Sequence, residues 1–410
     1  MYLKTLILLL FCFFTIGQIF AQTDSLKFMI QNRRSVPNEK DMSDFLRQVS
    51  KKKQHKIEHS KDTIENKYKK QFSFIPAAGY SLQTGFAVVA SANLAYFNDT
   101  ATSQKLSSIS TSITYTQYEQ VLAPLTFDIW TKDNKYNIIS DNRYIDYPSD
   151  IYGLGGRINP NKGHQIAFYG IKLHETILKS VANNFYVGAG IYIDRMWNIV
   201  VIDSVTRRLN NLINRQLGKN ELASSIALKM LYDNRLNQIN PKNGWFINTV
   251  YRDSRTFFGS DNNWQSLLVD VRKYFPFPSQ SQNTLALWSF NWLTLGGTPP
   301  YLLMPSTGWD DQYNTGRGYI QGRFRGNNMI YFESEYRFNI TRNGFVGGVV
   351  FGNLQYFTPE ISKQFQVLSP GYGGGIRLKL NKHSGANVCI DYGFGKDGSK
   401  GFFVNLGEVF

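Results

Sequence analysis

Residues 329–340 read MIYFESEYRFNI, and the alternation within this stretch decides the fold class. One side of an extended chain here would carry Ile330, Phe332, Tyr336, Phe338 and Ile340. The other side would carry Glu333, Glu335, Arg337 and Asn339. Successive side chains of a β-strand point to opposite faces of its sheet. The stretch therefore predicts a strand with one face toward lipid and the other toward a wet lumen, which is typical of a transmembrane β-barrel.

The composition of the chain favours such a barrel over a helical membrane protein. Mean hydropathy is −0.30, and no stretch after residue 21 approaches the roughly 18 continuous apolar residues of a membrane helix. Aromatic residues nevertheless make up 15% of the chain, with 24 tyrosines and 30 phenylalanines. A barrel needs apolar residues only at alternate strand positions and favours aromatic residues at both membrane interfaces. Three more stretches, 185–194, 376–380 and 388–394, alternate in the same way.

Turn-forming residues divide the chain after residue 70 into sixteen segments rich in β-branched and aromatic residues. Their approximate ranges are 72–81, 86–97, 107–117, 122–132, 136–147, 164–181, 185–200, 221–235, 244–253, 262–277, 283–297, 327–340, 345–357, 372–380, 386–395 and 402–410. Connections after even-numbered segments are mostly short, whereas several after odd-numbered segments are long, as outer-membrane barrels require. For residues 71–410 we therefore predict an all-β fold, a sixteen-stranded antiparallel transmembrane β-barrel with both termini in the periplasm.

The first 70 residues differ from the predicted barrel. Residues 1–21 combine Lys4, an apolar stretch too short to span a bilayer and Ala21 before a cleavage site, which predicts a secretory signal peptide. Residues 22–70 carry 13 Lys or Arg against 7 Asp or Glu. They predict a short basic periplasmic segment, for which a solvated tether and a partly ordered helix both stay open. Export predicts an integral protein of the bacterial outer membrane.

Export also limits the partners and the chemistry. The formal net charge of +15 favours outer-membrane lipid and lipopolysaccharide as partners, because an exported chain does not meet nucleic acid. Loss of Cys12 with the signal peptide leaves only Cys389, which excludes an intramolecular disulfide. The five histidines show no metal-ligand spacing, and no nucleophile has an evident neighbouring base. We expect no metal, no cofactor and no catalytic residue, and therefore no enzyme.

Four motifs follow one another in the second half of the chain. The first, within YDNRLNQINPKNGW, consists of Asp233, Arg235, Pro241 and Gly244. The second, within TGRGYIQGRFRG, consists of Arg317, Gly318 and Tyr319. The third is ESEYRF at 333–338, and the fourth is the carboxyl-terminal NLGEVF at 405–410. In this order and at these strand positions the motifs resemble BamA/TamA-type outer-membrane assembly barrels, the bacterial surface antigen family.

The resemblance implies a place for the arginine of the second motif. In such barrels the sixth external loop folds back into the lumen, where its arginine meets acidic groups of the inner wall. Glu333, Glu335 and Asp391 face inward by the alternation of their segments. A charge-assisted pair of Arg317 with Glu335 or Glu333 would then hold the loop. The alternative is a solvated Arg317, with the carboxylates merely lining a channel.

Two departures from the family pattern limit what the resemblance implies about function. Family members that insert or secrete proteins usually carry POTRA modules, and residues 22–70 are too few for one. The segment 345–357 also lacks the aspartate that relatives often place beside the loop arginine. Arg323 and Arg325 match no motif, and contacts with lipopolysaccharide or with the lumen both stay open for them.

The resemblance implies a role in outer-membrane biogenesis or translocation. The cargo would be a client protein or lipid, and partner proteins in the periplasm or the membrane would assist. The alternative is a passive pore or structural barrel that the sixth loop plugs. No motif distinguishes one client class from another.

The junction of the first and last strands is the predicted weak point. Closure would pair residues 72–81 with residues 402–410. Pro76 cannot donate a ladder hydrogen bond, and Gly407 adds no side-chain packing before the terminal Phe410. We interpret this junction as a seam that opens sideways toward lipid. The alternative is that Pro76 only marks the entry of the chain into a closed barrel.

Overall fold

The computed structural model describes residues 39–42, 44, 70–81, 84–98, 105–157, 163–202, 217–308, 314–360, 364–382 and 385–410. The predicted signal peptide, residues 1–21, and nearly all of the predicted basic segment, residues 22–70, lie outside the described residues. Within the described ranges, no helix is long and apolar enough to cross a membrane.

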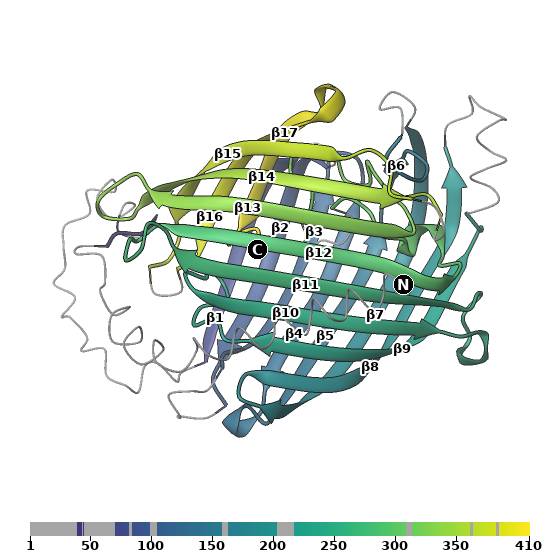
Figure 1. Cartoon of the computed structure of the whole chain (residues 1–410), viewed down its shortest axis with the longest axis horizontal. Coiled ribbons are helices and arrows are strands. Elements are labelled where there is room, and N and C mark those ends of the chain that lie inside the picture. The colour runs from purple at the N-terminus through teal and green to yellow at the C-terminus, as the bar shows by residue number, and fades with distance from the viewer. Residues whose placement is uncertain are drawn as a thin grey trace.

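One antiparallel sheet forms the wall of the molecule (Figure 1). Its strands are β1 (Gln71–Ser81), β2 (Gly85–Tyr96), β3 (Ser107–Thr116), β4 (Val121–Trp130), β5 (Tyr136–Asp146), β6 (Ser149–Ile151), β7 (His164–Ala182), β8 (Phe185–Val201), β9 (Glu221–Asp233), β10 (Gly244–Ser254), β11 (Trp264–Pro276), β12 (Thr284–Gly297), β13 (Asn328–Asn339), β14 (Val346–Thr358), β15 (Ser369–Lys379), β16 (Asn387–Gly395) and β17 (Lys400–Leu406). β5 and β6 both pair with β7 and form one crossing, interrupted at Pro148, which has no N–H for the ladder. The sheet therefore has sixteen crossings.

The prediction of a sixteen-stranded antiparallel barrel is confirmed. Each predicted segment overlaps one crossing, and most of the predicted ends lie within three residues of the observed ones. Turns and alternation are local properties of a sequence, and they are sufficient to divide this chain correctly. Short 3₁₀ turns, η1 (Lys132–Asn134), η2 (Thr256–Phe258), η3 (Tyr301–Leu303) and η4 (Lys396–Gly398), lie in the connections.

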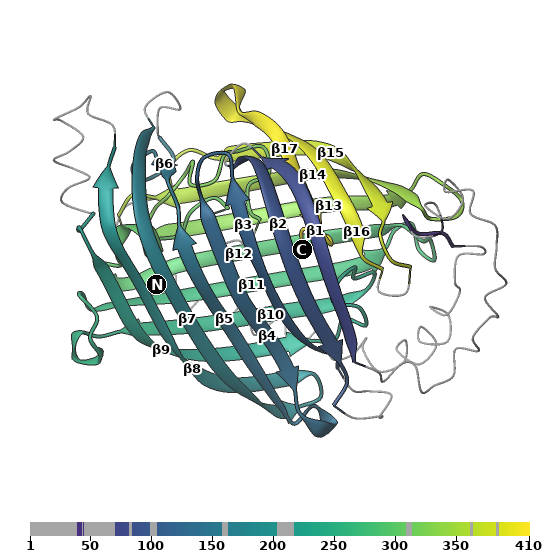
Figure 2. The same ribbon diagram turned by 180° about the vertical axis from the view of Figure 1, so that it is seen from behind.

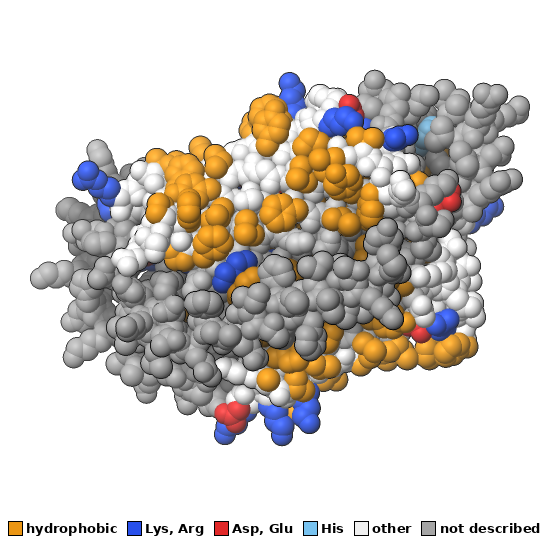
Figure 3. Space-filling view, in the orientation of Figure 1, with side chains coloured by type: hydrophobic (Ala, Val, Ile, Leu, Met, Phe, Trp, Pro, Cys, Tyr) orange, Lys and Arg blue, Asp and Glu red, His pale blue; other side chains and the backbone are white. Residues whose placement is uncertain are grey.

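The two faces of the wall have opposite chemistry. On β13, Ile330 and Phe332 are 39% and 43% exposed on the outside, whereas Glu333 and Glu335 are fully buried on the inside. Apolar side chains likewise cover much of the described wall in the space-filling view (Figure 3). An apolar outer band with a charged interior is what a membrane-spanning barrel requires.

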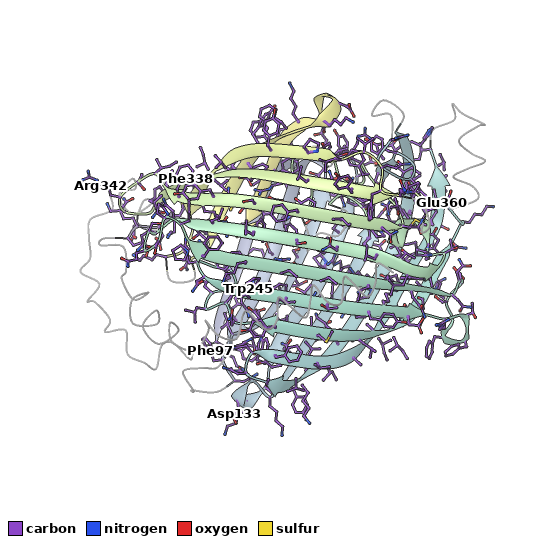
Figure 4. The ribbon with its side chains drawn as sticks, viewed as in Figure 1. Phe97, Asp133, Trp245, Phe338, Arg342 and Glu360 are labelled. Atoms are coloured by element: carbon purple, nitrogen blue, oxygen red, sulfur yellow. The ribbon has the colours of Figure 1, made fainter. Side chains whose placement is uncertain are left out.

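The two ends of the barrel differ in their connections. Asp133 and Arg342 lie in short connections at one end, and Glu360 lies in a longer one at the opposite end (Figure 4). The longest connections, 202–220 and 298–327, lie at the same end as Glu360, since they too follow odd-numbered crossings. We refer to the Asp133 end as the turn end and to the Glu360 end as the loop end.

The last strand is shorter than the predicted segment 402–410. β17 ends at Leu406, and Gly407 adopts a φ of +90°, which redirects the chain. Val409 and Phe410 are then buried against the inner wall, and the C-terminus lies within the outline of the barrel from both sides (Figures 1 and 2). Alternation could not reveal this turn because a glycine fits both a strand and a left-handed bend.

The predicted pairing of residues 72–81 with residues 402–410 is wrong. β1 pairs along its whole length with β2, and β17 pairs with β16. The two strands lie side by side (Figure 2), but no ladder joins them in the described parts of the chain. Residues 407–410 cannot contribute to such a ladder, because they lie inside the barrel.

A short acidic stretch of the N-terminal segment contacts the turn end. Lys40 donates its backbone N–H to the carbonyl of Asn343 at 3.1 Å, and Glu39 pairs with Lys379. Asp44 pairs with Lys382 at 2.8 Å. The described part of the segment is therefore attached to the turns that follow β13 and β15.

Candidate functional site: the sixth loop inside the barrel

The sixth loop, residues 298–327, joins β12 to β13 and folds into the lumen. Its Tyr319 and Phe324 belong to one buried apolar cluster with Trp288 of β12 and Tyr331 of β13. Tyr319 and Phe324 also meet edge to face at 5.2 Å. Because Trp288 and Tyr331 are inward-facing wall residues, the centre of the loop lies inside the barrel.

Arg317, near the tip of this loop, is held by three carboxylates. It is 1% exposed. Its Nη1 donates to Asp391 Oδ2 at 2.6 Å, and its Nη2 donates to both Glu333 and Glu335. Its guanidinium lies 3.7 Å from the ring centre of Phe351 on β14. We call Arg317 with these three carboxylates the arginine clamp.

The clamp keeps Arg317 charged in spite of its burial. Burial alone would lower the pKa of Arg317, but attraction by Glu333, Glu335 and Asp391 outweighs burial and raises the pKa well above its ordinary value. The planar guanidinium offers several donors in fixed directions, so one side chain can bridge β13 and β16. A lysine ammonium has the same charge but not this geometry.

The two residues after Arg317 fix the backbone of the loop against the wall. Gly318 has a φ of +106°, and a Cβ there would lie 2.5 Å from the carbonyl oxygen of Phe394. The hydroxyl of Tyr319 accepts a hydrogen bond from the N–H of Lys396 at 2.8 Å and donates one to the carbonyl of Pro370. The Arg-Gly-Tyr sequence thus combines a charge, a close backbone approach and an aromatic anchor.

Glycines of β15 make room for the clamp. The stretch 371–375 reads GYGGG. A Cβ at Gly371 would lie 2.7 Å from the carbonyl oxygen of Arg317, and a Cβ at Gly375 would lie 1.9 Å from Asp391 Oδ1. The loop backbone and the aspartate therefore lie directly on the glycine surface of this strand.

β14 lacks the aspartate that the family pattern places beside the loop arginine, and a carboxylate of another strand takes its position. β14 contributes Phe351 under the guanidinium, and Asn353 Nδ2 donates to the carbonyl of Arg317 at 2.9 Å. The third carboxylate comes from Asp391 of β16. The departure from the family pattern therefore does not leave the arginine short of acidic partners.

Two further arginines extend the clamp toward the turn end. Arg337 donates to Glu335 at 2.7 Å, and Arg377 donates to Asp391 at 2.5 Å. Glu333 instead accepts from the hydroxyl of Tyr331. Among the described residues, Arg317 is the one cation that pairs with Glu333.

The first motif builds the turn between β9 and β10. Arg235 binds Asp233 through two hydrogen bonds of 2.9 Å and lies 4.4 Å from the ring of Phe246. Gly244 has a φ of +111°, and Pro241 is buried in the same turn. The structure does not bring these four motif residues to the arginine clamp.

Arg323 and Arg325 lie within the folded loop. They are 4% and 1% exposed. Arg325 Nη1 donates to the carbonyl of Tyr301 at 3.0 Å, and the backbone of Arg325 bridges to Gly155 of the loop after β6. Arg323 lies 5.2 Å from the ring of Tyr152. The sequence left contacts with lipopolysaccharide and with the lumen open for both arginines. Their buried positions favour contacts with the lumen.

The seam residues do not form one group. Pro76 is exposed on the outside of β1, whereas Phe410 is 4% exposed on the inner wall. Phe410 stacks on Trp288 with ring centres 5.0 Å apart. Gly407 is the bend that separates the strand from this buried terminus.

Sequence reasoning missed the residues that complete the site. Phe351, Asn353 and the glycines of β15 match no motif, although the run GYGGG is a visible signal of close backbone approach. In the described ranges, no group of three or more His, Cys, Asp or Glu side chains is arranged so that it could hold a metal ion.

The barrel is similar to known structures. BamA from Haemophilus ducreyi lacking POTRA domains 1–3 aligns with a TM-score of 0.52 at 14% identity, covering 82% of this chain and 70% of that chain. CdiB from Acinetobacter baumannii gives 0.51 at 12% identity, covering 84% and 66%. CdiB from Escherichia coli gives 0.54 at 8% identity, covering 81% and 61%.

These similarities concern the fold. The chain spans less than two thirds of the length of either CdiB chain. No protein-family model matches the sequence, and no curated protein matches it either. The resemblance that the motifs indicated is therefore confirmed at the level of architecture, and the chain shares the barrel fold of BamA and CdiB.

Proposed function

We propose that this protein is an integral outer-membrane barrel that acts in membrane biogenesis or translocation and handles protein or lipid at the seam between β1 and β17. The observation that carries the proposal is that, among the described residues, no ladder pairs β17 with the edge of β1 that faces it. An open strand edge presents N–H and C=O groups that need partners, and in hydrocarbon only another chain can supply them. The role we propose is not enzymatic.

The surroundings of the edge support the same role. Phe72 and Phe74 of β1 are 70% and 62% exposed on the outside, and farther along the same pair of strands Phe86 and Val88 of β2 are 70% and 59% exposed. An apolar surface beside an open edge suits a segment that arrives from the membrane. The arginine clamp would meanwhile hold the sixth loop on β13–β16, so that movement is confined to the seam.

A disulfide across the seam tests the proposal. Phe74 and Val404 are both exposed on the outer face, whereas Asn405 pairs with inward-facing Cys389 and lies on the other face. We would therefore combine Phe74→Cys with Val404→Cys in a Cys389→Ser background and oxidise. We expect the locked protein to lose complementation of the deletion phenotype and to regain it on reduction.

A matched pair controls for the disulfide itself. Val88 and Tyr115 are direct partners on β2 and β3 and are both exposed on the outside. A disulfide between cysteines at these positions joins strands that are already paired, so full complementation is expected. Undiminished complementation by the seam-locked protein would contradict the proposed role.

A passive pore or structural barrel is the second candidate, favoured by the charged inner wall. Besides the clamp, Asp141 pairs with Arg143 at 2.6 Å, and Asp194 pairs with Arg252 at 2.7 Å. Single-channel recording separates the candidates. A large steady conductance, with unchanged outer-membrane protein and lipid composition in a deletion strain, would favour the pore.

The proposed partners differ between the two ends of the barrel. We propose lipopolysaccharide and outer-membrane lipid around the wall and the loop end, and periplasmic or membrane partner proteins at the turn end. Recovery of the intact complex from membranes, with identification of the bound proteins and lipids, tests both assignments.

A further inference from the structure

A glutamate interrupts the apolar outer face of β7. Ile171, Leu173 and Ile177 alternate along this face and are exposed, and Glu175 lies between the last two with its side chain exposed as well. Thr176, the next residue, is buried on the inside. Glu175 therefore points toward the membrane, where outer-membrane barrels carry apolar side chains.

The depth of Glu175 follows from its position in the strand. On the same face, Tyr169 stacks on Trp197 toward the loop end, and Lys179 lies near the turn end. Aromatic and charged side chains of this kind are typical of the two membrane interfaces. At about 3.3 Å per residue and a strand tilt of about 40°, Glu175 lies about 10 Å from the level of Lys179 and about 15 Å from that of Tyr169. Glu175 is therefore deep in an apolar band that is about 25 Å tall in such barrels.

The carboxylate is held to the wall through one of its oxygens. Glu175 Oε1 accepts a hydrogen bond from Ser140 Oγ at 2.7 Å and another from Asn142 Nδ2 at 2.8 Å. Both donors lie on β5, which pairs with β7 along this stretch and lies beside it (Figure 2). In the described part of the chain, Glu175 Oε2 accepts no hydrogen bond, and no cation pairs with the carboxylate. We call Glu175, Ser140 and Asn142 the outer polar cluster.

Other polar groups of the wall are compensated. On the inner face, the carboxylate of Asp141 pairs with Arg143 at 2.6 Å. On the outer face of β12, Asn291 donates to the hydroxyl of Ser289 at 3.0 Å, and both side chains are uncharged. Glu175 differs from both, because it combines an acidic group, an oxygen without a donor and apolar neighbours.

An ionised carboxylate in hydrocarbon needs a cation. The bilayer core holds no water that could solvate Oε2, and an unpaired charge there is costly. Lipid head groups lie at the interfaces, about 10 Å or more from Glu175. A guanidinium or ammonium group from a neighbouring membrane segment would supply both the charge and the hydrogen-bond donor.

A second copy of this chain does not bring such a cation to the cluster. The outward-facing cations of the described strands lie near one or the other edge of the apolar band; they are Lys179, Arg195, Lys273 and Lys400. Arg195, for example, lies opposite Ile171, four positions along the ladder from Glu175. The cation must therefore come from a different protein.

We propose that the outer face of β5, β7 and β8 around Glu175 docks a second membrane protein, which presents an arginine or lysine at this depth. The cation pairs with Glu175 Oε2, and apolar side chains of the partner pack against Leu173, Ile177 and Ile191. The inference rests on the membrane location within the proposed function and is independent of the seam.

A defined transmembrane peptide tests the charge requirement. The full-length barrel carries a donor dye at Asn183→Cys, in the turn between β7 and β8, in a Cys389→Ser background, and is placed in phosphatidylcholine vesicles. The probe is an acceptor-labelled leucine–alanine helix that spans the bilayer with one central arginine, and energy transfer measures binding. We expect the arginine helix to bind at least about tenfold more tightly than the same helix with a central glutamine.

Two substitutions assign this preference to the outer polar cluster. Glu175→Gln retains the size of the side chain and removes its charge, so the preference for the arginine helix should disappear. Asn291→Ala alters the uncharged pair of β12 and should leave the preference intact. Equal binding of both helices to the wild-type barrel, or an unchanged preference in Glu175→Gln, would overturn the inference.

Photocrosslinking in cells identifies the natural partner. A crosslinking amino acid replaces Ile191, the direct ladder partner of Glu175, or Phe332 of β13, which lies on the other side of the barrel (Figures 1 and 2). At position 191 we expect an adduct with another protein, mapped to a membrane segment that contains Arg or Lys and reduced at least about tenfold by Glu175→Gln. At position 332 we expect lipid adducts.

The adducts also separate this inference from the proposed function. Lipid adducts at position 332 together with only lipid, or only a second copy of this chain, at position 191 would overturn the inference and leave the proposed function standing. A protein adduct at position 191 that Glu175→Gln does not reduce would overturn it too. Absence of lipid adducts at both positions would contradict the membrane location, and both proposals would then fail.

Discussion

Removal of the Arg317 side chain should affect the three carboxylates of the arginine clamp to different extents. In Arg317→Ala, Glu335 retains Arg337, and Asp391 retains Arg377. Glu333 loses the one cation that pairs with it in the described structure and keeps only the hydroxyl of Tyr331. The defect therefore comes mainly from one uncompensated buried carboxylate.

The expected increase in loop undocking follows from the loss of one buried ion pair. Breaking a buried ion pair by removing one partner costs about 3–5 kcal/mol. At about 1.4 kcal/mol per factor of ten, the undocked population of the loop should rise by about 10²- to 4 × 10³-fold. Water entering the space left by the guanidinium would reduce the value toward the lower limit.

Protease cleavage of residues 298–327 from the loop end, with hydrogen exchange of the same residues, measures the undocked population. A second substitution then identifies the carboxylate responsible. Arg317→Ala with Glu333→Gln should recover part of the protection, whereas Arg317→Ala with Glu335→Gln should recover less. Arg342→Ala, at an exposed turn without an assigned ion pair, serves as control (Figure 4). Wild-type cleavage of Arg317→Ala, or equal recovery by both second substitutions, would refute the reasoning.

Two further predictions use matched positions. Gly318→Ala should undock the loop as Arg317→Ala does, because a Cβ there meets the Phe394 carbonyl at 2.5 Å. Gly398→Ala, also at positive φ but with nothing within 4 Å, should not; equal protease sensitivity of the two variants would contradict this. Lys382→Glu should release the acidic stretch around Asp44 from the turn end, and Asp44→Lys should restore the contact by exchanging the charges. Crosslinking of that stretch to the turn after β15 measures both, and unchanged crosslinking in Lys382→Glu would argue against the docking.

The strands and their faces could be predicted because both depend on local sequence. Alternation sends Ile330 outward and Glu333 inward whatever the rest of the chain does, since a slip of one residue would put the carboxylate into hydrocarbon. Hairpin connections then pair each strand with the next. The barrel fold consequently followed from one stretch and its repetition along the chain.

The arrangement of the clamp could be predicted only in part. Alternation placed Glu333, Glu335 and Asp391 on the inner face, but it does not say how far apart three strands hold them. That distance depends on the glycines of β15, which let Asp391 lie across the strand. A contact between β13 and β16 through a loop is a non-local property, and a periodicity of two residues contains no information about it.

The C-terminus shows why local pattern failed at the seam. Residues 402–410 keep the composition of a strand, yet β17 stops at Leu406. For the last four residues, pairing with β1 competes with burial of Phe410 and ion pairing of Glu408 on the inner wall. In the observed structure the inner wall holds them, and within the described part of the chain no ladder pairs the edge of β1 that faces β17. An incoming strand at that edge would therefore not have to displace a complete β17, because the tail has already withdrawn from it.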